Sequence, residues 1–341
     1  MRAAVFRGAQ APLSIETVPD PVPAADQVVI EVVHAGICGS DLHMAESEHT
    51  ASGLILGHEY AGTIAELGSG VSGSWKVGDR VTALPLFACH RADCAACSAD
   101  LPAICPANLF AGTDLLAQGA YAQLVGARAA MVQRLPDGVS FAEGAMVEPL
   151  AVGHHIVSRA ESLRDAAVLV LGGGPIGVAV ALFAALAGAR HVIVSERSPE
   201  RRALAVAMGA GVIDPAAGDV GEAFARLTGG QPQVVFECVG VPGMLAQAVS
   251  LVAIRGQVIV AGVIIEQDTF LPIVALGKEV TIRYSQAYAE RDFEAVIDAI
   301  ARGRIAPAPI HTSTVSLDAL PAAFAALRGN PRECKVLISP A

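Results

Sequence analysis

The sequence is poor in charged residues, and above all in positive charge. Lysine and arginine together number 23 against 33 aspartates and glutamates, and the formal net charge is −10. No cluster of lysine and arginine offers a track for phosphates, which argues against a nucleic-acid surface. With 53% hydrophobic and only 16% charged residues, the composition excludes a disordered chain. The expected partners are a small molecule or another copy of the chain.

Targeting and membrane segments are also missing. The first ten residues lack the apolar run and cleavage site of a secretory signal, which favours a cytoplasmic protein. Residues 166–189 are apolar, uncharged and long enough for a bilayer, but Gly-Gly-Gly-Pro breaks them into a strand and a helix. We therefore expect no membrane span. Without repeats, linkers or low-complexity tracts, 341 residues predict two folded domains.

The pattern of apolar and polar residues changes near Glu148. Before it, short strand-like runs such as QVVIEVVHAGI and DRVTALPLF alternate with turns, which indicates an irregular β domain. After it, apolar runs of strand length alternate with helix-like segments, as in VLVLGGG followed by VAVALFAALAGA. This alternation is typical of a doubly wound parallel sheet, so the predicted fold class is α/β. From about Arg291 the tail adds two helical patterns and a closing strand, KVLIS.

A glycine-rich segment, GGGPIG at residues 172–177, fits the pattern G-x-G-x-x-G between a predicted strand and a predicted helix. Gly172 permits the tight turn, Gly174 lets a pyrophosphate approach the backbone, and Gly177 allows close helix–strand packing. The next strand ends at Glu196, which can accept hydrogen bonds from an adenosine ribose and would repel a 2′-phosphate. The segment therefore favours NAD over NADP. The alternative is an ordinary strand–turn–helix with a solvated glutamate.

A thiol, an imidazole and a carboxyl group occur at Cys38, His58 and Glu148. Together they suit Zn²⁺ with one coordination position open, as in catalytic zinc sites. Glu59 and Asp41 stand beside these candidates as outer partners, and Glu59 is also an alternative ligand. Singly, each residue has a structural explanation: a buried thiol, a core histidine and a glutamate at a helix start. The set is what predicts a metal.

Four of the seven cysteines, Cys89, Cys94, Cys97 and Cys105, lie in one short segment. Four thiolates so close in sequence indicate a closed tetrahedral zinc site that cross-links the loop. Free thiols in an ordinary loop are the alternative, disfavoured because thiols this dense are prone to oxidation. Disulfides explain the odd total less well in a chain without a secretion signal.

Taken together, these segments resemble the zinc-dependent medium-chain dehydrogenase/reductases, in the branch of the sorbitol, idonate, butanediol and threonine dehydrogenases. The resemblance covers essentially the full length and is carried by CGSDLH, GHEYAG, VGDRV, the cysteine loop, VEPLAV, GGGPIG, FECVG and KVLI. It implies a GroES-like catalytic domain over residues 1–148 and 290–341 around a Rossmann NAD-binding domain over residues 149–289. It also implies a homodimer or homotetramer, usually formed through the Rossmann domains.

The resemblance further implies roles for individual residues. Cys38, His58 and either Glu59 or Glu148 would bind the catalytic zinc, while Ser40 and His43 would carry the alcohol proton away. The expected cofactor contacts are Gly172, Gly174, Pro175, Ile176, Gly177, Glu196, Arg201 and the backbone of Ala261, Gly262 and Val263 on the nicotinamide side.

The expected function is zinc-dependent hydride transfer between a secondary alcohol and NAD, giving a ketone. The alcohol would be a polyol, a diol or a sugar-derived alcohol. One rival is a metal-free, NADPH-dependent enoyl or quinone reductase of the same fold, against which the three zinc-ligand candidates argue. Another rival is a non-catalytic dinucleotide sensor, which would need no proton path such as Ser40 and His43.

Three features depart from the family pattern. Structural zinc cysteines are usually spaced C-x2-C-x2-C-x7-C, so Arg91 stands where the first is expected and Cys89 fits only through a two-residue bulge. Met44 replaces a tyrosine frequent in polyol dehydrogenases, and residues 286–288, Gln-Ala-Tyr, replace Phe-Arg-Tyr. The lost polar contacts predict a less polar or unusual secondary alcohol, with idonate-like polyols as the alternative.

Overall fold

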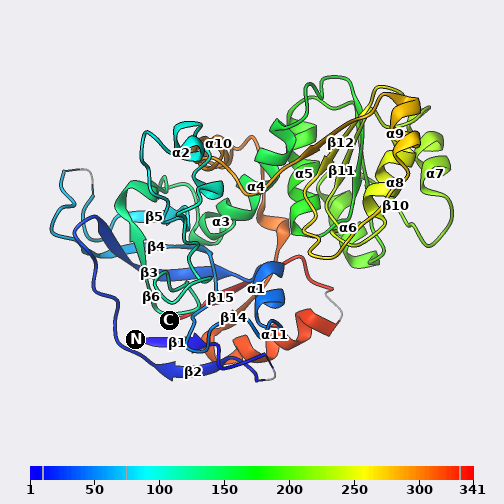
Figure 1. Ribbon diagram of the computed structural model, residues 1–341. Coiled ribbons are helices and arrows are strands. Elements are labelled where there is room, and N and C mark those ends of the chain that lie inside the picture. The colour runs from blue at the N-terminus through cyan, green and yellow to red at the C-terminus, as the bar shows by residue number, and fades with distance from the viewer. Residues whose placement is uncertain (10, 74, 330–331) are drawn as a thin grey trace. The chain divides into compact units, whose positions relative to one another are not determined.

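Two compact units make up the chain in the computed structural model, which describes residues 1–9, 11–73, 75–329 and 332–341 (Figure 1). The first unit comprises Met1–Glu148 and Tyr288–Ala341, and the second comprises Pro149–Ala287. Both termini therefore belong to the first unit.

The first unit is built on a seven-stranded sheet. Its strands follow the order β14-β15-β3-β4-β5-β7, and β6 pairs with β3. They are β3 (Gln27–Gly36), β4 (Glu59–Leu67), β5 (Arg80–Ala83), β6 (Leu124–Arg128), β7 (Val132–Arg134), β14 (His311–Ser316) and β15 (Lys335–Ser339). A separate antiparallel pair consists of β1 (Arg2–Val5) and β2 (Ser14–Thr17). The predicted β-rich domain is confirmed.

Short helices accompany this sheet. They are α1 (Gly39–Met44), α2 (Ala95–Ser98), α3 (Phe141–Ala145), α10 (Glu290–Ala301) and α11 (Leu320–Gly329). The apolar strand β15 lies between β14 and β3, so the end of the chain completes a sheet begun near its start. Its buried residues share a core with Tyr60 and Tyr121, two of the largest fully buried side chains.

The second unit is a six-stranded sheet in the order β10-β9-β8-β11-β12-β13, and every neighbouring pair is parallel. Its strands are β8 (Ala167–Leu171), β9 (His191–Ser195), β10 (Gly211–Ile213), β11 (Val234–Glu237), β12 (Gln257–Val260) and β13 (Thr281–Tyr284). Its helices are α5 (Pro175–Leu186), α6 (Pro199–Ala207), α7 (Val220–Thr228), α8 (Met244–Leu251) and α9 (Pro272–Lys278). Helix α4 (Val147–Ser158) begins at the junction of the units. The predicted doubly wound sheet is confirmed.

The glycine-rich turn joins β8 to α5 as the sequence predicts. Gly172 has φ +93°, a conformation that other residues rarely adopt. A Cβ on Gly177 would lie 1.9 Å from the carbonyl oxygen of Gly172, so only glycine fits there. The proline at the first position of α5 has the φ that a helix start requires. Throughout the described residues, no helix has both the length and the apolar character needed to cross a bilayer.

Candidate functional site

The pairing of two strands creates the first candidate site. Strands β3 and β4 are antiparallel and place Gly36 opposite Glu59. Cys38 follows β3 and precedes α1, while His58 precedes β4. As a result, one ligand atom from each of Cys38, His58 and Glu59 lies within 4.8 Å of the others. We call these three residues the mixed cluster. Among the described residues, Glu148 does not complete a candidate metal group.

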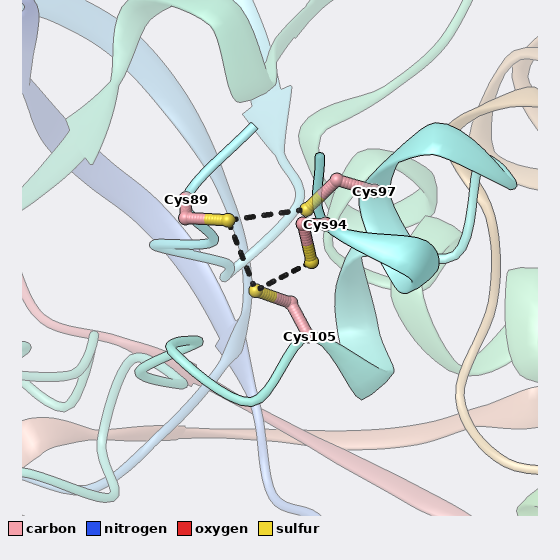
Figure 2. A group of neighbouring side chains, drawn as sticks. All are labelled: Cys89, Cys94, Cys97 and Cys105. Carbon is pink, nitrogen blue, oxygen red and sulfur yellow. Dashed lines mark hydrogen bonds between the residues drawn. The ribbon is translucent and has the colours of Figure 1, made fainter. Parts of the chain in front are cut away.

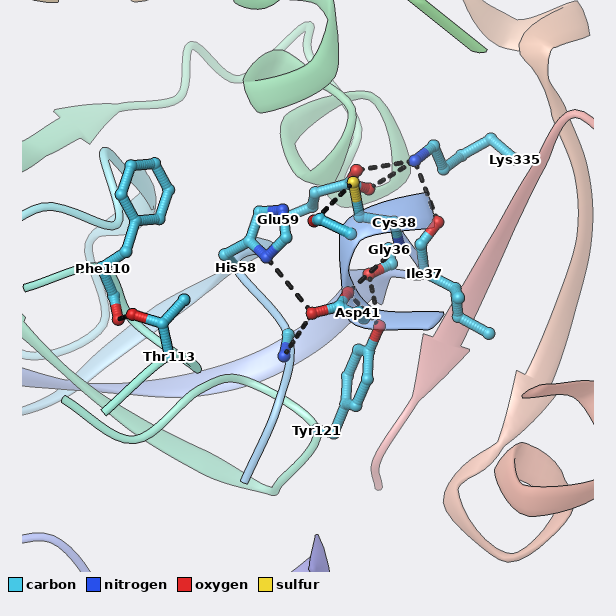
Figure 3. A network of polar contacts seen from close by, with 12 residues as sticks. Gly36, Ile37, Cys38, Asp41, His58, Glu59, Phe110, Thr113, Tyr121 and Lys335 are labelled. Carbon is cyan, nitrogen blue, oxygen red and sulfur yellow. Dashed lines mark hydrogen bonds and ion pairs between the residues drawn. The ribbon is translucent and has the colours of Figure 1, made fainter. Parts of the chain in front are cut away.

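Asp41 lies below His58 and Cys38 in Figure 3 and contacts both residues. It is fully buried, and its Oδ1 lies 3.4 Å from His58 Nδ1 and accepts the Gly57 N–H at 3.3 Å. Its Oδ2 accepts the Tyr121 hydroxyl at 2.6 Å and the Cys38 N–H at 3.2 Å. Because Asp41 faces Nδ1, the ring of His58 keeps Nε2 for a metal, the arrangement found where a carboxylate orients a histidine ligand. The residues therefore fit a zinc ion.

Glu59 has a buried counter-ion that the sequence analysis missed. Lys335 Nζ, at the start of β15, lies 2.7 Å from both carboxylate oxygens of Glu59 and donates to the Ile37 carbonyl at 3.1 Å. Burial opposes the charge of Lys335, but the negative charges of Glu59 and Cys38 outweigh it and raise the pKa of Lys335. A Cβ on Gly36 would lie 2.0 Å from a Glu59 oxygen, so the pair also requires that glycine.

Glu148, the other carboxylate candidate, lies beside Tyr288. The pKa of Glu148 is raised to about 7, and burial is the main cause. The charge of His58 and the Tyr288 hydroxyl lower this pKa, whereas the charge of Glu59 raises it. The rings of Tyr288 and Phe110 have centroids 6.5 Å apart, and the Phe110 ring meets the ring of His58 edge-on at 6.0 Å. Aromatic side chains thus border the mixed cluster next to Glu148.

The two expected proton-relay residues lie on α1. Ser40 Oγ donates a hydrogen bond to Cys38 Sγ at 3.2 Å. His43 follows three residues later in the same helix, so the two side chains share a face, and both are exposed. They can therefore connect the mixed cluster with solvent.

The second cluster brings together all four cysteines of residues 89–105 (Figure 2). Their sulfur atoms lie 3.7 Å apart for Cys89 and Cys97, 3.8 Å for Cys94 and Cys105, and 3.5 Å for Cys105 and Cys89. Sulfurs at the corners of a tetrahedron around zinc, each about 2.3 Å from the ion, are about 3.8 Å apart. This four-cysteine cluster suggests a structural zinc.

The extra residues between Cys89 and Cys94 form a turn. His90 has φ +49°, Arg91 Nε donates to Asp93 Oδ1 at 2.9 Å, and the Cys94 N–H donates to the Arg91 carbonyl at 3.1 Å. This turn absorbs the two-residue insertion and brings Cys89 into the cluster. Backbone N–H groups, above all that of Cys89, lower the pKa of Cys105 to about 6. The loop thereby favours a thiolate at that position.

In the second unit, Glu196 lies against the glycine-rich turn. Its Oε2 accepts the Gly173 N–H at 2.7 Å and its Oε1 accepts the Ser198 N–H at 2.8 Å. A Cβ on Gly174 would have Arg201 Nη1 as its neighbour at 3.8 Å, so Arg201 borders the same turn. The N–H groups of residues 261 and 262 both donate to the Glu237 carbonyl at 2.9 Å. The turn, the carboxylate and the helix start together fit a dinucleotide.

Both units match family models. The alcohol dehydrogenase GroES-like domain matches residues 24–137 and the zinc-binding dehydrogenase model matches residues 175–302. A 2-dehydro-3-deoxy-L-galactonate 5-dehydrogenase from Pseudoalteromonas atlantica is 33% identical over 93% of this chain and 92% of its own.

Two solved structures share the whole fold. An alcohol dehydrogenase from Escherichia coli CFT073 in complex with NADH has a TM-score of 0.92 and 28% identity, covering 100% of this chain and 99% of its own. A zinc-binding dehydrogenase from Sinorhizobium meliloti bound to NADP has a TM-score of 0.91 and 32% identity, covering 99% of each chain.

Fold and matches together define the class of dinucleotide-dependent dehydrogenases that pair a GroES-like domain with a Rossmann domain. Within that class, the chain belongs to the zinc-dependent medium-chain alcohol dehydrogenase family. The predicted family and fold are confirmed, whereas the roles of individual residues stay predictions.

Proposed function

We propose that this protein transfers hydride between a secondary alcohol, of the polyol, diol or sugar-derived kind, and NAD, giving a ketone. The mixed cluster carries the proposal, because a thiol, an imidazole and a carboxylate converge within 4.8 Å on a buried supporting network. When bound there, zinc supplies Lewis-acid polarisation of the alcohol oxygen. Cys38 and His58 would hold the ion with Glu59 or Glu148, and the structure favours Glu59 by proximity.

The protein's own residues do the remaining work. Asp41 fixes the ring of His58, and Lys335 pairs with the buried side chain of Glu59. Ser40 Oγ accepts the proton of the substrate hydroxyl as its own hydroxyl proton moves on toward His43, which passes a proton to solvent from the same face of α1. The half-buried Phe110, whose ring meets that of His58 edge-on, would restrict the substrate beside the cluster with aromatic surface. That surface supports a substrate with apolar as well as hydroxyl groups.

An activity screen tests this function. The purified, zinc-loaded protein is mixed with NAD and a panel of polyols, diols, sugar acids and apolar secondary alcohols, and NADH is followed by its absorbance. We expect turnover of at least one secondary alcohol and its loss after chelation, with recovery on adding Zn²⁺. Turnover that survives complete removal of zinc would contradict the proposal.

The preference for NAD over NADP rests on Glu196. A 2′-phosphate would approach a carboxylate whose two oxygens already accept backbone N–H groups, and it would be repelled. Replacing Glu196 by glutamine should narrow the ratio of kcat/KM for NAD to that for NADP by about tenfold. An unchanged ratio would assign the preference elsewhere.

A homodimer or homotetramer that assembles through the second unit is also part of the proposal. Strand β13 lies at the edge of the six-stranded sheet, and Leu271, Ile273 and Leu276 of the α9 region are 66–71% exposed. Exposed apolar surface beside an open sheet edge is typical of a subunit interface. A second copy, related by a two-fold axis, would cover both. Light scattering should give a dimer or tetramer for the wild type and a smaller species for Leu276→Glu.

A further inference from the structure

The second unit contains a buried carboxylate with an incomplete set of partners. Glu237, the last residue of β11, is fully buried. Its Oε1 accepts the N–H groups of Val239 at 2.7 Å and Gly240 at 2.9 Å. Its Oε2 is buried and has no hydrogen-bond partner among the described residues. Burying such a group is costly, so its position in the fold matters.

Glu237 stands at the functional edge of the sheet. Strand β11 lies between β8, which leads into the glycine-rich turn, and β12. In a sheet of this strand order, a dinucleotide lies across the carboxyl ends of the strands where the order reverses. Glu196, after β9, would contact the adenosine half on one side of β8. The ends of β11 and β12, on the other side, would then hold the nicotinamide half, so the inference rests on the proposed function.

Close backbone packing surrounds the carboxylate. A Cβ on Gly262 would lie 2.4 Å from Glu237 Oε2, and a Cβ on Gly240 would lie 2.7 Å from the Val263 nitrogen. On the opposite side, a Cβ on Gly172 would lie 3.0 Å from a methyl group of Val239. Glycines therefore let the loop after β11 pack between the glycine-rich turn and the end of β12. At Gly262, no side chain separates the carboxylate from the backbone expected to line the nicotinamide side.

Only one of the two oxygens of the Glu237 carboxyl group has hydrogen-bond donors. Both donors to Oε1 are backbone N–H groups, and the described residues place no hydrogen-bond partner at Oε2. Within the described ranges, Glu237 also has no ion-pair partner. Burial and the charge of Glu237 raise the pKa of the neighbouring Cys238 thiol. A negative charge on this side chain would therefore not be neutralised by a cation among the described residues.

We propose that the buried Glu237 side chain carries a negative charge and that this charge stabilises the oxidised cofactor relative to the reduced one. The nicotinamide ring carries a positive charge in NAD⁺ and none in NADH. A fixed negative charge in a poorly polarisable interior attracts the cation and has little effect on the neutral ring. The residue would not touch the reacting atoms, so its effect appears in the ratio of the two affinities.

Calorimetric titration of the zinc-loaded protein tests this ratio directly. Glu237→Gln keeps the size of the side chain and removes its charge. We expect the Kd for NAD⁺ to rise about tenfold and the Kd for NADH to change less than about twofold. Glu237→Asp, which retains the charge, should keep the wild-type ratio. Glu266→Gln is the matched control, because it removes an exposed, solvent-screened charge from the loop after β12.

Equal losses of affinity for NAD⁺ and NADH in Glu237→Gln would overturn the inference, because they would show a purely structural role. If that variant does not fold, wild-type protein titrated with benzamide adenine dinucleotide decides. This analogue has the shape of NAD⁺ without the ring charge, and we expect it to bind about tenfold more weakly. Equal affinity for the analogue and for NAD⁺ would overturn the inference. Wild-type protein that binds no dinucleotide would instead refute the proposed function.

Discussion

The two candidate zinc sites of the first unit are built in opposite ways. The four-cysteine cluster takes all its ligands from residues 89–105, and three of its cysteines are only partly buried. The mixed cluster takes Cys38 from one strand end and His58 and Glu59 from another, and Lys335 from the far end of the chain supports it. A closed set of like ligands suits a metal that cross-links a loop, whereas unlike ligands on a buried charged network suit chemistry.

The largest difference should appear in activity. Replacing His58 by alanine removes a ligand of the mixed cluster, and we expect kcat/KM to fall by about a thousandfold or more, because a catalytic metal contributes several kcal/mol. The assay is NADH formation from the best alcohol of the screen. His49→Ala, which removes an exposed histidine ahead of β4, is the control and should leave the rate unchanged. If the His58→Ala variant turned over substrate at the wild-type rate, the mixed cluster would be excluded as the reaction centre.

The support of the mixed cluster should be visible in stability. Lys335→Met leaves the Glu59 carboxylate buried without its counter-ion, and breaking such a pair costs about 3–5 kcal/mol of unfolding free energy. Denaturant unfolding measures the change. The matched control is Arg255→Met, which breaks an ion pair with Glu279 whose side chains are 77% and 64% exposed. That change should cost less than about 1 kcal/mol of unfolding free energy. Similar losses in both variants would show that the Lys335–Glu59 pair contributes no more to stability than an exposed pair.

Loss of a ligand from the four-cysteine cluster should affect stability more than activity. Cys105→Ser is expected to lower Tm by roughly 5–10 °C and to change kcat at 25 °C by less than about threefold, because that zinc would hold a loop. Differential scanning fluorimetry and the NADH assay measure the two effects. Ser98→Ala, in α2 of the same loop, should alter neither. A loss of kcat as large as that of His58→Ala would mean that the two clusters are not separate in function.

The contrast also explains how far the sequence could lead. The glycine-rich turn, the parallel sheet and the four cysteines are local patterns, so spacing alone predicts them, and the His90–Asp93 turn then accounts for the unusual position of Cys89. The sequence presents Lys335 only as part of the closing KVLI, because no local pattern shows that β15 enters the sheet beside β3.

Tyr121 and Glu237 show the same limit. The Tyr121 hydroxyl reaches Asp41 from 80 positions away, and nothing near it in the sequence announces that contact. Glu237 lies in FECVG, which indicates the family, but its unpaired oxygen depends on the packing of Gly262. The preference for Glu59 over Glu148 as third ligand, which stays a prediction, likewise rests on three-dimensional proximity.

Zinc content is the measurement that bears most directly on the central claim. Protein purified with Zn²⁺ and analysed by plasma mass spectrometry should contain about two zinc ions per chain. His58→Ala should retain about one zinc, held by the four cysteines, and be inactive. Cys105→Ser should also retain about one but remain active. An active wild-type enzyme with zinc only at the four cysteines would contradict the account.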